Sequence, residues 1–224
     1  MQLNNLAIVG GGTAGLITAL ILRKTYPNLK IDLLESDKIG IVGVGEGSTE
    51  HWRNFIGDCQ IKISDLVAET DCTFKYGINF ENWLGDGTNY IHNVSSNMSV
   101  ESQTHTKIMY AHAVGQGLSA KHLVMPHVEK SLHVEPYWGV NQFHFNTFKL
   151  NNFLHKICQQ RNINVINTEI DRVHLTESGS IDYLENVLGH QHKYDFYVDS
   201  TDFIDFYYIK PWVFLGEVIV SICP

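Results

Sequence analysis

The sequence has little of what would mark a nucleic-acid, metal or membrane protein. Its 224 residues carry 16 Lys and Arg against 24 Asp and Glu, a formal net charge of −8, and the basic residues form no cluster. A nucleic-acid footprint needs a basic patch, so that class is excluded. The twelve histidines show no metal-ligand spacing, which predicts no metal site. The apolar run 203–224 is interrupted by Asp205, Lys210 and Glu217, so it falls short of the ~20 apolar residues of a membrane span.

Cysteines are also few. The four of them, Cys59, Cys72, Cys158 and Cys223, lie far apart and form no CxxC pair. This usage is typical of free thiols in a reducing compartment rather than of a disulfide frame or a zinc site. The N-terminus has no basic region before its short apolar run, which argues against a signal peptide. We therefore expect a cytoplasmic protein.

The clearest structural signal lies at the start of the chain. "NLAIVG" reads as a buried strand, "TAGLITALILRKTY" as a helix with an apolar face, and "LKIDLLE" as a second strand that ends on an acid. Strand, glycine turn, helix and strand make a βαβ unit, which predicts a parallel sheet. Later segments predict a helix over 146–161, with Leu150, Phe153, Leu154 and Ile157 on one face, and four further strands up to residue 200.

The turn between the first strand and the helix carries a dinucleotide-binding pattern. Gly10, Gly12 and Gly15 are spaced G-x-G-x-x-G, and Glu35 follows twenty residues later at the end of the next strand. In this pattern the glycines make a tight turn, admit a pyrophosphate and allow close helix packing, while the acid accepts hydrogen bonds from a ribose. The helix N-terminus adds free N–H groups for the phosphates. The pattern alone does not separate FAD from NAD.

A second segment, "DCTFKYGINFENW" (71–83), alternates like one strand, with Phe74 and Ile78 on one face and Lys75 on the other. By spacing alone, Lys75 is a solvated surface lysine. Before it, the glycine-rich loop at 38–50 leads into a short helix that Ser48 or Thr49 would cap. Residues 85–140 are polar and weakly periodic, which predicts loops and short elements over a cavity.

Taken together, three motifs in order resemble the flavin-dependent tryptophan halogenase family. They are "GGGTAGLITAL" (10–20), "GVGEGSTE" (43–50, here called the strap segment) and "FKYGINFENW" (74–83). The resemblance continues in "NQFHFNTFKLNNFLHKI" (141–157) and "YDFYVDSTDF" (194–203). It implies an α/β fold, a Rossmann-like FAD-binding domain with an inserted, partly β substrate-side layer.

The resemblance also implies roles for individual residues. FAD would be bound by Gly10, Gly12, Thr13, Ala14, Gly15, Glu35 and Ser36, with Glu46 and Gly47 in the strap segment and Ile170 near the adenine end. Reduced FAD from a separate flavin reductase would react with oxygen and with chloride or bromide to give hypohalous acid. Lys75 would be the catalytic lysine that presents this species to an electron-rich aromatic ring. His92 would stack on the substrate. The sequence leaves a homodimer open.

Three features depart from the family. Asn146 replaces an Asp, a change we expect to be tolerated. Val94 stands where an aromatic residue is usual, which favours another indole or a phenol over free tryptophan. From Asp202 onward the resemblance stops, and the second half of the family with its catalytic glutamate does not follow. We therefore expect a truncated form, with a frameshift near codon 202 as one explanation and a natural short protein as another.

The expected organisation is a FAD-binding βαβ unit with strap segment and lysine strand (1–84), a substrate-side insertion (85–140), the return of the FAD-binding domain (141–203) and an atypical tail (204–224). Two alternatives to a halogenase remain at this stage. One is a non-halogenating FAD-binding monooxygenase, and the other is an inactive dinucleotide-binding fragment.

Overall fold

The computed structural model describes residues 3–41, 46–49, 51–75, 77–93, 108, 111–112, 115–117 and 142–201. The chain forms two compact units. Unit 1 comprises 1–44, 58–70 and 146–224, and unit 2 comprises 45–57 and 71–145. The four domain boundaries predicted from the sequence stay a prediction. The predicted tail at 204–224 and most of the predicted insertion lie outside the described residues.

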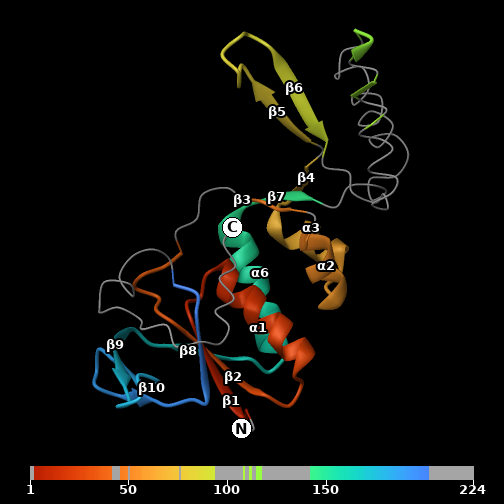
Figure 1. Cartoon of the computed structure of the whole chain (residues 1–224). Coiled ribbons are helices and arrows are strands. Elements are labelled where there is room, and N and C mark those ends of the chain that lie inside the picture. Colours follow the sequence, from red (N-terminus) through yellow and green to blue (C-terminus); the bar gives the residue numbers. More distant parts are fainter. Residues whose placement is uncertain are drawn as a thin grey trace. The chain divides into compact units, whose positions relative to one another are not determined.

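Unit 1 is built on a parallel sheet with the strand order β12-β1-β2-β8 (Figure 1). Its strands are β1 (Asn5–Val9), β2 (Lys30–Glu35), β8 (Asn164–Asn167) and β12 (Phe196–Asp199). The two central strands, β1 and β2, are buried over almost their whole length. A parallel sheet covered on both faces needs such continuous apolar runs. The predicted α/β fold class is thereby confirmed.

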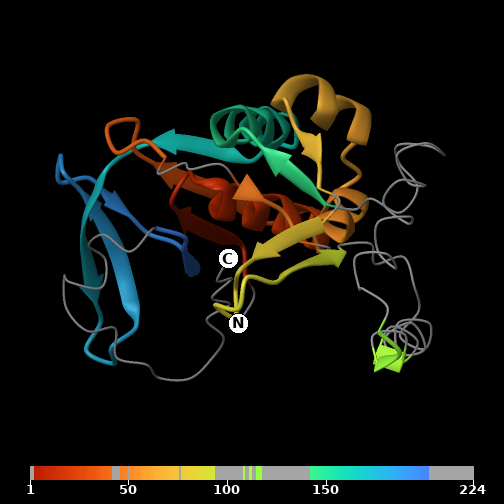
Figure 2. The same ribbon diagram turned by 90° about the horizontal axis from the view of Figure 1, so that it is seen from above.

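Helices α1 (Thr13–Thr25) and α6 (Thr147–Gln160) run alongside each other in this unit (Figure 2), and α3 (Ile63–Thr70) packs on α6. The predicted apolar face of α6 is confirmed, because Leu150, Phe153, Leu154 and Ile157 are all buried. Asn146 is the N-cap of α6, and its side-chain oxygen accepts a hydrogen bond from the Lys149 N–H at 3.1 Å. Such a cap satisfies one of the first four N–H groups of a helix.

A small antiparallel sheet, β11-β10-β9, completes unit 1. Its strands are β9 (Ile170–Leu175), β10 (Ile181–Asn186) and β11 (Gln191–His192). The turn predicted at Ser178-Gly179 joins the first two, and Gly179 has a φ of 86° that suits glycine. Leu184 of β10 packs with Ala7, Val9 and Leu34, so this sheet shares a core with the parallel sheet.

Unit 2 contains a three-stranded antiparallel sheet of order β3-β7-β4 and a separate hairpin, β5-β6. The strands are β3 (Glu46–Gly47), β4 (Thr73–Phe74), β5 (Gly77–Glu81), β6 (Asn89–Asn93) and β7 (Phe143–Phe145). Helix α2 begins at His51 and ends at Asp58. The short helix predicted after the strap segment is confirmed. The hydroxyl of Ser48, one of the two predicted caps of this helix, accepts a hydrogen bond from the Phe143 N–H of β7 at 2.8 Å.

The single strand predicted over 71–83 is wrong. The chain there forms two strands in two different sheets, with Lys75 between them. β4 pairs with β7, whereas β5 pairs with β6. Within the described part of the chain, no helix is long and apolar enough to cross a membrane.

Candidate functional site

The glycine turn after β1 is closed by close backbone approaches. Gly10 has a φ of 116°, and its N–H donates to the Leu34 carbonyl at 2.9 Å. A Cβ at Gly10 would lie 2.4 Å from the Ser200 carbonyl oxygen, and one at Gly15 would lie 2.0 Å from the Gly10 carbonyl oxygen. Both distances are too short for a Cβ atom, so a side chain at either position would force the backbone of β1 and α1 to shift.

Gly12 is different, because its surroundings are open. A Cβ there would meet no heavy atom of another described residue within 4 Å. Gly12 is also the N-cap of α1 and has no side chain with which to cap it. The N–H groups of Thr13 and Ala14 belong to the first turn of α1, where backbone N–H groups have no acceptor within the helix and the positive end of the helix dipole lies. This geometry fits a pyrophosphate.

Glu35 ends β2 beside this turn. Its carboxylate lies over Gly11, since a Cβ at Gly11 would be 1.8 Å from Glu35 Oε2. The same oxygen lies 3.1 Å from His155 Nε2 on α6, and both side chains are 19% exposed. The backbone of Glu35 is fixed as well, because its carbonyl accepts from the Thr168 N–H at 2.6 Å. An acid held at this place can accept hydrogen bonds from the hydroxyls of a ribose.

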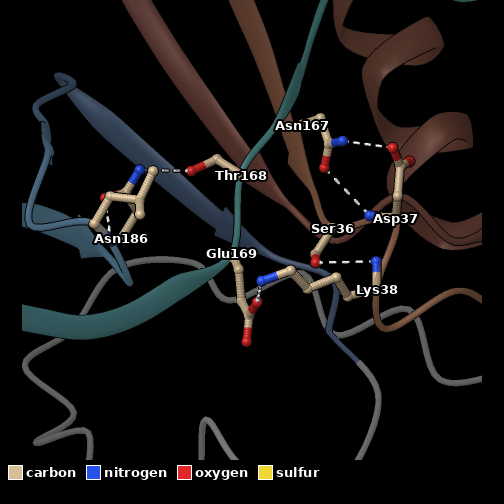
Figure 3. Close-up of polar contacts among 8 residues, drawn as sticks. Ser36, Asp37, Lys38, Asn167, Thr168, Glu169 and Asn186 are labelled. Atoms are coloured by element: carbon tan, nitrogen blue, oxygen red, sulfur yellow. Dashed lines mark hydrogen bonds and ion pairs between the residues drawn. The ribbon is translucent and has the colours of Figure 1, made fainter.

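The segment after Glu35 is tied to the segment after β8 (Figure 3). The Asn167 side chain accepts from the Asp37 N–H at 3.2 Å and donates to the Asp37 carboxylate. Lys38 Nζ contacts Glu169 at 3.2 Å, and the Lys38 N–H donates to the Ser36 hydroxyl at 3.3 Å. Ile170 follows directly at the start of β9. The predicted residues Ser36 and Ile170 thus belong to two joined segments at the ends of neighbouring parallel strands, where α/β proteins bind nucleotides.

Lys75 lies in unit 2, half-buried, between β4 and β5. Its N–H donates to the Gln142 carbonyl at 3.0 Å, which extends the pairing of β4 with β7 by one residue. Its Nζ donates to the Ser48 carbonyl at 3.3 Å. The ammonium is therefore held against the strap segment by one backbone acceptor.

Two further residues meet at this point of the strap segment. A Cβ at Gly47 would lie 3.4 Å from His144 Nδ1 and 3.6 Å from Lys75 Nζ. Gly47 pairs with His144 across β3 and β7, and Glu46 pairs with Phe145. Because Gly47 has no side chain, the amine and the imidazole both reach the same patch of backbone. Sequence reasoning placed His144 only within a resembling motif and gave it no role.

Aromatic packing on one face of the β3-β7-β4 sheet explains why the Lys75 side chain lies on the other face. Phe74 packs on Phe143 with ring centroids 5.5 Å apart, and Trp52 of α2 packs on Phe145 at 4.8 Å. The aromatic residues of β4 and β7 alternate with Lys75 and His144 along the chain. Burying the aromatic face under α2 forces the basic side chains to the other face.

His92 lies in β6, opposite Ile78 in the register of the hairpin. Val94, the departure noted next to it, lies outside the described residues. The structure thus brings together Gly10, Gly12, Gly15, Glu35, Ser36 and Ile170 in unit 1, and Glu46, Gly47 and Lys75 in unit 2. Within the described residues, no group of three His, Cys, Asp or Glu side chains is placed to hold a metal ion.

Residues of α6 were missed by sequence reasoning. Asn151 Nδ2 donates to the Gly11 carbonyl at 2.8 Å, and His155 faces Glu35. The sequence did carry an indication of this role, because Asn151 and His155 are four residues apart and therefore lie on the same face of the predicted helix. Only the apolar face of that helix was considered. Asn167, which holds the segment after Glu35, gave no comparable signal within its short strand.

Fold and site together are those of an α/β protein with the glycine turn and acid of a dinucleotide-binding pattern. The model of the tryptophan halogenase family matches residues 5–207, so the chain belongs to that family. The resemblance inferred from the motifs is thereby confirmed.

Two curated tryptophan halogenases each match less than half of the chain. The 7-chloro-L-tryptophan 6-halogenase KtzR of Kutzneria sp. (strain 744) is 37% identical over 86 residues, which is 38% of this chain and 17% of the relative. The tryptophan 6-halogenase SttH of Streptomyces toxytricini is 32% identical over 99 residues, 44% of this chain and 19% of the relative.

Solved structures match almost the whole chain. Xcc4156, a flavin-dependent halogenase from Xanthomonas campestris, superposes with a TM-score of 0.74 at 28% identity, covering 90% of this chain and 42% of that one. SttH superposes with a TM-score of 0.73 at 22% identity and shows the same fold, covering 90% of this chain and 44% of that one. The chain therefore spans less than half the length of the halogenases it matches.

Proposed function

We propose that this chain is the flavin-binding and lysine-bearing part of an FADH2-dependent halogenase that acts on an electron-rich aromatic substrate. The observation that carries the proposal is the contact of Lys75 with the strap segment in a member of the tryptophan halogenase family. The glycine turn in unit 1 supplies the second requirement, a place for the cofactor.

The residues present fit FAD. The open backbone at Gly12 and the first N–H groups of α1, at Thr13 and Ala14, suit the pyrophosphate. Glu35 and Ser36 suit the ribose, and Ile170 offers an apolar contact near the adenine. Bound there in its reduced form, FAD supplies the two electrons with which oxygen converts chloride or bromide to hypohalous acid.

The chemistry assigned to this chain's own residues centres on the Lys75 amine. An ammonium on a flexible stem can donate a hydrogen bond to the oxygen of hypohalous acid, which makes the halogen more electrophilic. The Ser48 carbonyl engages one of its protons and orients the others. The O–X bond then breaks as the halogen passes to a ring carbon of the substrate, and the oxygen takes up a proton and leaves as water. The same ring carbon loses its proton to the solvent, which restores the aromatic ring.

The finer expectations are part of the same proposal. The substrate is an indole or another electron-rich aromatic, with His92 stacking on its ring. A separate flavin reductase delivers the reduced cofactor by diffusion. A cytoplasmic location accords with the buried thiols of Cys59, Cys72 and Cys158, which are not joined in disulfides. A homodimer stays a prediction.

The test is a halogenation assay of the 224-residue chain with FAD, a flavin reductase, NADH, bromide and a panel of tryptophan, indole and phenol. Brominated product from the parent and none from Lys75→Ala, with an equal rate of flavin reoxidation in both, would support the proposal. Lys156→Ala is the matched control, because this lysine lies on α6 and pairs with Glu69 at 2.7 Å. Equal halogenation by Lys75→Ala and the parent would remove Lys75 from the mechanism.

A second candidate function follows from the length comparison. Because the chain spans only 42% of the Xcc4156 halogenase, dinucleotide binding without halogenation is the alternative. It predicts flavin binding by the parent but no brominated product under the same conditions. A non-halogenating monooxygenase, the remaining alternative, would instead give a hydroxylated product without bromide.

A further inference from the structure

One face of α6 lies against the dinucleotide turn through three polar contacts. Asn151, His155 and Cys158 are spaced four and three residues apart, so they form a single stripe along the helix. Asn151 Nδ2 donates to the Gly11 carbonyl at 2.8 Å, His155 Nε2 lies 3.1 Å from Glu35 Oε2, and Cys158 Sγ donates to the Leu16 carbonyl at 3.8 Å. This stripe of α6 thus contacts the glycine turn at Gly11, the carboxylate of Glu35 and the first helical turn of α1 at Leu16.

The two carboxylate oxygens of Glu35 differ in the contacts that hold them. Oε2 lies over Gly11 and at ion-pair distance from His155. Gly11 itself is held by the buried Asn151 from the same stripe. A free glutamate side chain samples several rotamers, and fixing it on binding costs conformational entropy. A partner that already holds one oxygen removes part of that cost.

We propose that His155 is a positioning residue for the ribose-binding acid: it fixes Oε2 of Glu35 so that Oε1 is presented to a ribose hydroxyl. The inference rests on the proposed function, because it assumes that the turn binds an adenine nucleotide. It assigns a nucleotide-selecting role to α6, an element outside the βαβ unit that carries the glycine pattern.

The competing explanation is that the pair only ties α6 to the sheet. Nucleotide discrimination separates the two, since a structural tie affects all nucleotides alike whereas a positioned carboxylate favours those with the hydroxyl it contacts. In this site pattern the acid contacts the ribose 2′-OH. ADP and 2′-deoxy-ADP are therefore the probes, and the ratio of their dissociation constants is the readout.

The experiment is isothermal titration of the 224-residue chain and its variants with both nucleotides, with thermal unfolding recorded for each protein. A hydrogen bond to a charged group is worth about tenfold in affinity, so we expect the parent to prefer ADP by about tenfold. His155→Leu should reduce the preference to about twofold or less. His155→Gln, whose amide nitrogen can reach the same oxygen, should restore most of it.

His174→Leu is the matched control. This histidine lies 3.3 Å from Glu185 in the β11-β10-β9 sheet, so the substitution removes a comparable pair that is separate from the glycine turn. It should keep the preference of the parent. Should His155→Leu fail to fold, His155→Asn replaces it, because its amide is too short to reach Glu35.

The outcomes are distinct. A parent that prefers ADP and a His155→Leu that has lost the preference support the inference. An unchanged preference in a folded His155→Leu overturns the inference and leaves the proposed cofactor site intact. A parent that binds neither nucleotide overturns both the inference and the proposed function.

Discussion

A Cβ atom at Gly15 would lie 2.0 Å from the carbonyl oxygen of Gly10, so the start of α1 and the end of β1 touch through bare backbone. Gly15→Ala should therefore destabilise the fold by about 1–3 kcal/mol, the cost of overpacking a filled site. Urea unfolding followed by circular dichroism measures this loss.

The control for that substitution is Gly57→Ala in α2. No heavy atom of another described residue lies within 4 Å of a Cβ there, and the glycine is helical. Alanine should leave the free energy of unfolding unchanged or raise it by up to about 1 kcal/mol, since alanine favours helix. Equal effects of the two substitutions would mean that the packing of the turn has been misassigned.

Asn146 is predicted to matter through its cap on α6. Its side-chain oxygen accepts from the Lys149 N–H, so Asn146→Ala should lower the free energy of unfolding by about 1 kcal/mol. Asn146→Asp should be neutral or slightly stabilising, because aspartate caps equally well and favours the helix dipole. Denaturation of the three proteins decides this, and a loss on Asn146→Asp as large as that on Asn146→Ala would contradict the capping role.

The buried thiol of Cys158 is expected to make the free energy of unfolding depend on pH in the alkaline range. Burial raises the pKa of its thiol to about 12 from 9.0, with the negative charge of Glu35 adding to the effect. The unfolded thiol loses its proton near pH 9 while the folded thiol keeps it, so the stability that the neutral thiol contributes is present below pH 9 and is lost as pH rises toward 12. The loss is about 1.4 kcal/mol per pH unit in that range.

Urea unfolding at pH 8 and pH 10 tests this expectation. The free energy of unfolding of the parent should fall by about 1 kcal/mol more between these values than that of Cys158→Ala. Other groups whose pKa is raised by burial, such as Tyr194 and Cys59, act in both proteins and cancel in the comparison. Identical pH dependence in the two proteins would contradict the assignment to Cys158.

The parts of the structure that were predicted from sequence are those where a local pattern decides the outcome. The unit β1-α1-β2 was predictable because a buried strand, a glycine turn and an amphipathic helix follow each other within 35 residues. The apolar face of α6 was predictable for the same reason. Family membership followed from motifs in order, and the family model confirms it.

The predictions from sequence that failed are those that depend on which strands pair with each other. Alternation over 71–83 cannot show that β4 joins β7 while β5 joins β6, because both pairings keep the same side-chain period. The short strand β7 and helix α3 give too few periods to be recognised. The contact between His155 and Glu35 joins residues 120 positions apart in the sequence, and neither residue indicates the other.

The most direct test of the account is the affinity of the 224-residue chain for FAD compared with that of Gly12→Val. Because a Cβ at Gly12 meets no heavy atom of the described residues within 4 Å, the variant should unfold at nearly the same temperature as the parent. The same side chain would occupy the approach of the pyrophosphate, so FAD affinity, measured by quenching of flavin fluorescence, should fall at least about tenfold, the cost of about one lost charged hydrogen bond. A folded Gly12→Val that binds FAD as tightly as the parent would contradict the assignment of this turn as the cofactor site.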